Sequence, residues 1–165
     1  MFRKILVPID GSPPARRGLE EAILLAKDQS ASIRLLHVLD ESAVTRAYDG
    51  TTYLPASYVD DLMRNLTAAG SKLIKDAAAK ARQRRVKVEG VLLEAFGRRV
   101  ADVIVAEAKK WSADVIVLGT HGRAGLSRVV LGSDAELVVR ESPCPVLLVR
   151  GKVTAAGTRK ATKRR

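Results

Sequence analysis

Short apolar runs alternate along the chain with longer stretches in which apolar residues recur every three or four positions. Runs bounded by glycine, proline or polar residues are typical of buried strands, and the longer period is typical of amphipathic helices. We therefore predict strands over residues 3–9, 32–39, 86–94, 115–118 and 145–150, and helices over residues 13–29, 58–85, 98–111 and 133–141.

Local signals refine these helices. Ser12 fits the N-cap position of the first helix, and Pro13 follows it at the first helical position. Gly70 lies inside the long helix and is expected to weaken it. Ala106 is expected to face the core from the helix over residues 98–111. Residues 40–57 show no regular spacing of apolar residues, and we interpret them as a loop that covers a ligand.

Strands that alternate with helices without a break indicate a parallel sheet with helices on both faces and right-handed connections. We predict a three-layer α/β/α fold with five parallel strands in the order 3-2-1-4-5, numbered along the chain. In such sheets a ligand binds beyond the carboxyl ends of the strands where the order reverses, which lies between the first and fourth strands here. The turns over residues 8–11 and 119–122 then face each other.

The fourth predicted strand ends in a glycine-rich loop with the spacing G-x2-G-x9-G-S. Glycine N–H groups and a helix start together favour an anion, and phosphate is the natural guest. The spacing is neither a Walker A loop nor a G-x-G-x-x-G dinucleotide fingerprint. The alternative is a strand-to-helix connection that uses glycine only to turn. The residues of the motif are Gly119, Gly122, Gly132 and Ser133.

Composition indicates one globular domain. The chain has 165 residues, of which 47% are hydrophobic, and we predict a single domain over residues 1–150. The apolar runs are strand-sized and the N-terminus has no signal-type stretch, so we expect a cytoplasmic protein that does not span a membrane. The single Cys144 cannot form an intrachain disulfide and is expected to be a small buried residue.

The net charge of +11 is concentrated at the C-terminus. Residues 151–165 carry six Lys or Arg and no acid, so they contribute +6 and leave +5 for residues 1–150. This tail keeps no apolar period and is expected to be disordered. It could bind nucleic acid weakly and in a salt-dependent way, or serve only as a solubilising terminus.

The sequence resembles the universal stress protein family, and specifically its ATP-binding branch. The resemblance covers nearly all of residues 1–150 and leaves the tail outside. It implies an adenine-nucleotide α-hydrolase-like fold, and the glycine spacing separates the nucleotide-binding branch from relatives that lack it. The segments that carry it are ILVPIDGS at 5–12, LHV at 36–38, ADVIVLGTHG at 113–122, GS at 132–133 and PCPVLLV at 143–149.

The resemblance also implies a nucleotide site. The adenine and ribose would lie against Pro8, Asp10, Val38 and Leu118, and the Asp10 carboxylate would accept from ribose hydroxyls. The phosphates would be wrapped by Gly119, His121, Gly122, Gly132 and Ser133. The implied cofactor is ATP, or alternatively ADP or AMP, with Mg2+ or Mn2+.

Two of these assignments have open alternatives, and one further residue departs from the family pattern. Asp10 precedes Gly11 and could serve as a turn-forming Asx residue, and His121 could be an ordinary loop histidine. Asp134 departs from the small neutral residues common after the Gly-Ser pair. Its carboxylate would compete with phosphate for helix-start N–H groups unless a divalent cation bridges the two, which makes Asp134 a weak candidate metal ligand.

We interpret the chain as a nucleotide-responsive stress or regulatory protein and not primarily as an enzyme. A slow ATPase or an autophosphorylating enzyme, with Ser127 or Ser133 as acceptor, is one alternative. A non-nucleotide interaction module, or a nucleic-acid binder acting through its tail, is the other. The last predicted strand would leave an apolar edge, so we expect a homodimer that pairs residues 146–149 of two copies.

Overall fold

The computed structural model describes residues 1–40, 56–120 and 132–150. The predicted loop over residues 40–57, apart from its ends, lies outside these ranges, as do the part of the glycine loop that contains His121, Gly122 and Ser127 and the basic tail. The elements follow in the order β1 (Lys4–Pro8), α1 (Pro13–Gln29), β2 (Ser32–Leu39), α3 (Ala56–Gln83), β3 (Lys87–Glu94), α4 (Val100–Trp111), β4 (Val115–Gly119), α5 (Ser133–Glu141) and β5 (Val146–Val149).

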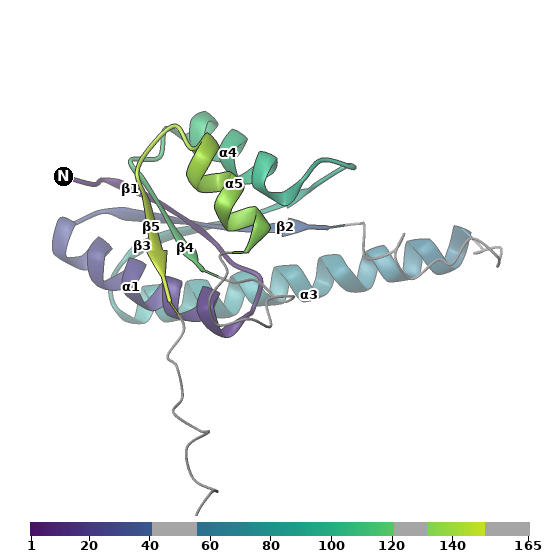
Figure 1. Cartoon of the computed structure of the whole chain (residues 1–165). Coiled ribbons are helices and arrows are strands. Elements are labelled where there is room, and N and C mark those ends of the chain that lie inside the picture. Colours follow the sequence, from purple (N-terminus) through teal and green to yellow (C-terminus); the bar gives the residue numbers. More distant parts are fainter. Residues whose placement is uncertain (41–55, 121–131, 151–165) are drawn as a thin grey trace, which may run out of the picture.

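The strands form one five-stranded sheet in the order β3-β2-β1-β4-β5 (Figure 1). Each pair of neighbours is parallel, with Val7 of β1 opposite Leu35 of β2 and Leu6 opposite Ile116 of β4. This confirms the predicted fold class and strand order. The order reverses between β1 and β4, and in sheets of this kind ligands bind beyond the carboxyl ends of the strands at that point.

Helices cover both faces of the sheet. Side chains that alternate along β1 divide between two core clusters: Ile5 and Val7 face α1 and α3, and Leu6 faces α4 and α5. All three are completely buried. Each such side chain contributes roughly 1.5–3 kcal/mol relative to exposure, so the central strand is the main anchor of the fold. Cys144 is half-buried against the α4 and α5 cluster, less buried than expected.

The helix ends follow from local sequence. The Ser12 hydroxyl accepts from the Ala15 N–H at 3.2 Å, which confirms the predicted N-cap of α1. Ser30, with φ of 54°, ends that helix in the left-handed conformation. The prediction that Ala106 faces the core was wrong, because Ala106 is exposed and Ala101 is buried instead. At 3.6 residues per turn, Ala106 lies about 200° around the helix from the buried Ile104.

Two glycines let α3 lie close to the sheet. A Cβ at Gly70 would stand 2.6 Å from Cδ2 of His37, and one at Gly90 would stand 2.1 Å from Cγ2 of Ile74. Gly70 therefore allows close packing where the sequence indicated only a weak point. Figure 1 shows α3 continuing past the end of the sheet. Within the described residues, no helix is both long and apolar enough to cross a bilayer.

Candidate functional site

The turn after β1 is held by its own side chains. The Ser12 N–H donates to Oδ1 of Asp10 at 2.9 Å, and the guanidinium of Arg16 donates to the Gly11 carbonyl at 2.8 and 3.0 Å. Gly11 has a φ of 79°, which glycine adopts without strain. Asp10 thus forms the Asx turn that the sequence offered as its alternative role. The same turn holds the half-buried Asp10 carboxylate at the carboxyl end of β1.

The end of β4 meets both the start of α1 and the start of α5. A Cβ at Gly119 would lie 2.7 Å from the carbonyl carbon of Pro14, so glycine lets α1 begin directly beside β4. Thr120 is buried, its N–H donates to Val149 at 3.0 Å, and its carbonyl accepts from the Gly132 N–H at 3.0 Å. The last bond brings the two described ends of the glycine motif together.

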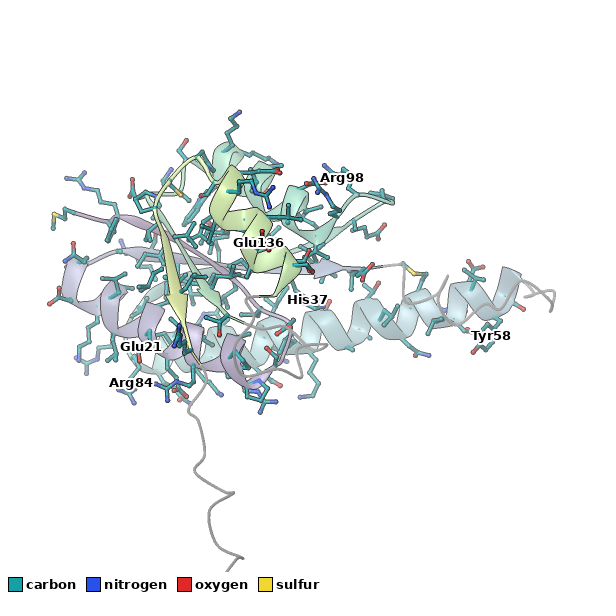
Figure 2. All side chains as sticks on the ribbon, viewed as in Figure 1. Glu21, His37, Tyr58, Arg84, Arg98 and Glu136 are labelled. Atoms are coloured by element: carbon teal, nitrogen blue, oxygen red, sulfur yellow. The ribbon has the colours of Figure 1, made fainter. Side chains whose placement is uncertain are left out.

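Helix α5 begins beside this junction. Gly132 is its N-cap, with φ of −61° and ψ of 145°, and it offers no side chain to the N–H groups of the first turn. Such N–H groups, at the positive end of the helix dipole, suit an anion. Ser133, Asp134 and Glu136 in this first turn are all exposed, and Glu136 can be seen in Figure 2.

Arg99, at the start of α4, is influenced by the charges of α5. Its pKa is raised above its ordinary value, chiefly by its hydrogen bond to Asp102 and more weakly by Glu141 and Asp134.

The apolar residues expected at the site lie on one face of the sheet. Val38 and Leu118 both belong to the α4 and α5 side, where Leu118 is buried and Val38 half-buried. Pro8 is buried and follows Leu6 by two positions along β1, so it faces the same side. The three residues come from strands that are neighbours at the reversal point. They form an apolar wall beside the Asp10 turn.

The structure therefore gathers most of the predicted site residues at the carboxyl ends of β1, β2 and β4. His121 and Gly122 lie outside the described residues. Gly119 and Gly132 also have structural roles: Gly119 packs against α1, and the Gly132 N–H donates to Thr120. The motif spacing alone does not reveal these contacts, because Pro14 lies far from Gly119 in the chain and the bond from Gly132 to Thr120 depends on how the intervening loop folds.

Carboxylates and guanidinium groups are mixed at this end of the molecule, where Arg16, Arg98 and Arg99 also lie. The described carboxylates at or just after strand ends, or in the first turn of α5, are Asp10, Asp40, Glu94, Asp134 and Glu136. Among the described residues, no group of three or more His, Cys, Asp or Glu side chains is placed to hold a metal ion. Asp134, in the first turn of α5, would repel a bare polyphosphate at that helix start, and a bound divalent cation would relieve the repulsion.

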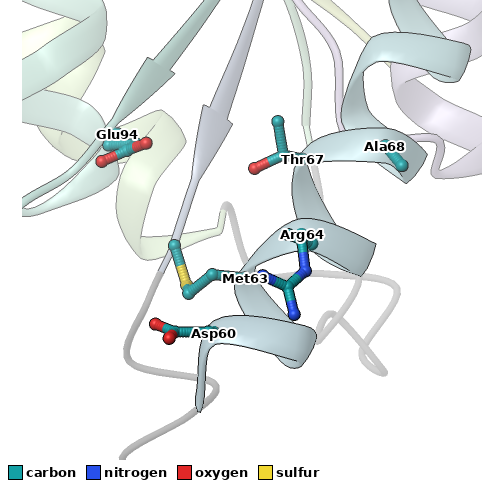
Figure 3. Close-up of a pocket in the computed structure, with 6 residues that line it drawn as sticks. All are labelled: Asp60, Met63, Arg64, Thr67, Ala68 and Glu94. Atoms are coloured by element: carbon teal, nitrogen blue, oxygen red, sulfur yellow. The ribbon is translucent and has the colours of Figure 1, made fainter. Parts of the chain in front are cut away.

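An open cavity of about 470 Å³ lies at the same end of the sheet but at its edge, between α3 and the end of β3 (Figure 3). None of its lining residues was predicted as part of the site. Arg64 at its wall forms an ion pair with Asp61 in the preceding turn of α3. The cavity is open to solvent and acidic at two points, so it does not resemble a phosphate cradle. The lining residues are Asp60, Met63, Arg64, Thr67, Ala68 and Glu94.

The fold defines a class: open parallel α/β proteins, whose ligands generally bind where the strand order reverses. Residues 1–150 match the model of the universal stress protein family, and the chain belongs to that family.

Relatives and solved structures agree with this assignment. The chain is 36% identical over 151 residues to universal stress protein YxiE of Bacillus subtilis strain 168, with 91% of this chain and 100% of that protein covered. It is 34% identical over 151 residues to universal stress protein MJ0531 of Methanocaldococcus jannaschii, with 91% and 83% covered. The solved structure of hypothetical protein MJ0577 superposes with a TM-score of 0.78 at 26% identity, covering 92% of this chain and 98% of that one.

Proposed function

We propose that this chain binds an adenine nucleotide, in the first place ATP, beyond the carboxyl ends of β1 and β4, and acts as a nucleotide-responsive regulator. The observation that carries the proposal is the meeting of three segments at one end of the sheet. Gly119 packs against the start of α1, directly after the Asp10 turn, and Thr120 accepts from Gly132 at the start of α5. A carboxylate and an uncapped helix start suit a ribose and a phosphate respectively.

Each part of the nucleotide has a matching surface. The base and sugar would lie against the apolar wall of Pro8, Val38 and Leu118, with the ribose hydroxyls donating to Asp10. The phosphates would lie at the N–H groups of Ser133 and the next residues of α5. The glycine spacing adds Gly119, Gly132, His121 and Gly122 to the phosphate side.

Other proteins of this fold have been solved with adenine nucleotides. They include a universal stress protein in complex with cAMP, an Arabidopsis thaliana family member with AMP bound, and an Archaeoglobus fulgidus member with dAMP. Their identities to this chain are 18%, 20% and 21%, so they show the shared fold alone. The proposal for this chain therefore rests on its own residues.

A divalent cation would accompany the nucleotide. Asp134 is exposed in the first turn of α5, close in sequence to the proposed phosphate position at Ser133. Hard oxygen ligands such as this carboxylate suit Mg2+ or Mn2+, which would link it to phosphate oxygens. We expect Mg2+ to strengthen the binding of ATP more than that of AMP, because ATP brings the greater negative charge close to the Asp134 carboxylate.

Calorimetry with ATP, ADP, AMP and cAMP, each with and without Mg2+, tests the proposal. The diagnostic variant is Asp10→Asn, because an asparagine oxygen still accepts from the Ser12 N–H and preserves the Asx turn. Loss of the charged acceptor should weaken ATP binding by roughly tenfold, the usual worth of a hydrogen bond to a charged group. Asp28→Asn, at the far end of α1, makes the same charge change and should leave affinity unchanged.

Two outcomes would contradict the proposal: no binding by the parent protein at millimolar nucleotide, or equal affinity of the parent and Asp10→Asn. Phosphate release measured over hours separates the regulator from the enzyme alternatives. We expect stoichiometric binding without turnover. Sustained release, or phosphate transferred to a serine, would establish the slow ATPase or the autophosphorylating enzyme instead.

We also propose that two copies pair through β5. This strand lies at the edge of the sheet, and Leu147 in it is 43% exposed. Pro145 and Val149 accept from β4, so by the alternation of a parallel ladder the backbone groups of Val146 and Leu148 face away from the sheet. An apolar edge with outward N–H and C=O groups suits a second copy of the same strand about a two-fold axis.

A further inference from the structure

His37 is a buried histidine between the sheet and α3. It is 9% exposed, and it lies on the α1 and α3 side of β2, two positions from the buried Leu35 (Figure 2). Its Nδ1 lies 2.7 Å from the carbonyl oxygen of Ile9. Because a carbonyl oxygen can only accept, the hydrogen of this bond must be on Nδ1. The contact therefore selects a ring with a protonated Nδ1.

The bond holds the residue that leads into the proposed ribose ligand. The Ile9 carbonyl belongs to the peptide group that joins Ile9 to Asp10, and the Ile9 N–H donates to Leu36 at 2.8 Å. Both backbone groups of Ile9 are thus bonded to β2. The N–H donates to the main chain of Leu36, and the carbonyl accepts from the side chain of His37. The plane of the peptide sets the direction in which the chain continues into Asp10.

A gap in α3 accommodates the ring. A Cβ at Gly70 would lie 2.6 Å from Cδ2 and 3.2 Å from Nε2 of His37, and 2.9 Å from Cδ1 of Leu92. Leu92 stands opposite His37 in the register of β2 and β3. Glycine inside a helix costs about 1 kcal/mol relative to alanine, and here it is the residue that leaves room for the imidazole.

We propose that His37 is a positioning residue, which orients Asp10 for the nucleotide by holding the peptide group between Ile9 and Asp10. This role rests on the proposed nucleotide site. The competing explanation is that His37 only fills space in the core. The two explanations differ in which property of the side chain matters, its Nδ1–H donor or its volume.

Two substitutions separate donor from volume. His37→Asn keeps an N–H donor bonded to Cγ, as Nδ1 is, but leaves part of the ring's space empty. His37→Leu fills the space and removes the donor. If His37 is a positioning residue, the variant with the higher Tm should bind nucleotide more weakly than the variant with the lower Tm. His37→Asn should bind AMP and ATP within about threefold of the parent despite the lower Tm, and His37→Leu should bind about tenfold more weakly despite the higher Tm.

A third variant shifts the imidazole of His37 without replacing the residue. Gly70→Ala places a Cβ against Cδ2, so the imidazole must shift away from α3 and the bond to Ile9 must change. We expect affinity to fall in the same direction as in His37→Leu. Affinity losses that simply follow Tm across all three variants would show that His37 acts by packing alone and would overturn the proposal.

Backbone amide NMR spectra without nucleotide keep this test separate from the test of nucleotide binding. The amide resonances of Asp10, Gly11 and Ser12 should move in His37→Leu and stay close to the parent in His37→Asn. If the parent binds no nucleotide, the proposed function fails even though this pattern appears. If the parent binds nucleotide and these amides respond equally to both substitutions, the positioning role fails and the nucleotide site stands.

Discussion

At the scale of single residues, Gly119 stands where the start of α1 crosses the end of β4. A Cβ there would approach Pro14 and Ala15 to 2.7 and 2.8 Å, and both contacts are with backbone atoms that cannot rotate away. Gly18 lies in the same contact from the side of α1, but its Cβ would be 3.5 Å from the Gly119 nitrogen, an ordinary distance. Of the two glycines, only Gly119 is required by close packing.

Gly119→Ala should therefore destabilise the protein. We expect the free energy of unfolding, measured by urea denaturation, to fall by about 1–3 kcal/mol, the usual cost of forcing an extra methyl into a packed contact. Gly18→Ala is the matched control and should stay within about 1 kcal/mol of the parent or exceed it, because alanine is the better helix former. Equal stability of Gly119→Ala and the parent would show that α1 yields easily at this contact.

At the scale of elements, β1 is tied to the turn that precedes β4. The Asp114 carboxylate accepts from the N–H groups of Arg3 at 2.7 Å and Lys4 at 2.9 Å. These two backbone hydrogen bonds, with weaker help from the charge of Lys4, hold the pKa of Asp114 below its ordinary 3.8. The ammonium of Lys4 also donates to the Trp111 carbonyl at 3.0 Å. The central strand is thus fixed at its start by a carboxylate remote in sequence.

The depressed pKa predicts how stability depends on pH. The folded protein binds a proton at Asp114 less readily than the unfolded chain, so its carboxylate stabilises the fold above about pH 4 and loses this effect as the pH falls through the folded pKa. Asp114→Asn should lower the Tm at neutral pH, and the difference from the parent should shrink below about pH 4. Tm measured from acid to neutral pH checks this.

Asp76→Asn is the control for the acid series. Its pKa is also lowered, first by the hydrogen bond from Lys72, but the pair is fully exposed on α3. Surface pairs of this kind are screened by water and salt, so little effect on Tm is expected at any pH. If Asp114→Asn lowers the Tm as much in acid as at neutral pH, the carboxylate acts through its shape and not through its charge.

At the scale of the whole molecule, four helices share one arrangement of charge at their C-terminal ends. Helices α1, α3, α4 and α5 each carry Lys or Arg in the last turn, which lies toward the amino ends of the strands. These cations match the negative ends of the helix dipoles. The two edge strands of the sheet also differ. β3 has eight residues, whereas β5 has four and exposes Leu147.

Leu147→Lys tests the proposed dimer. A charge in the centre of the β5 edge should oppose pairing, so sedimentation at micromolar concentration should show a dimer for the parent and a monomer for the variant. Tyr58→Lys introduces the same charge at a side chain that is 55% exposed on α3, away from β5, and should leave the dimer intact. A monomeric parent would refute the dimer, and a dimeric Leu147→Lys would move the interface elsewhere.

Much of the fold could be predicted because its signals are local. The cap at Ser12, the alternation of strands with helices and the glycine at the end of β4 each depend on neighbours in the chain, and the strand order is the one common to doubly wound parallel sheets. Gly70 and Ala106 were misjudged because their surroundings come from elsewhere. The partner of Gly70 is an imidazole on another strand, and the orientation of Ala106 depends on where α4 meets the sheet.

The sequence by itself determined the elements, the family and the residue types of the proposed nucleotide site, because periodicity, turns and motif spacing are written along the chain. Only the tertiary structure decided how those residues are held. It showed that Asp10 forms a turn with Ser12, that His37 bonds to Ile9, and that Gly132 bonds to Thr120. The last two contacts join residues far apart in the sequence, which come within bonding distance only when the strands pair and the helices pack against them.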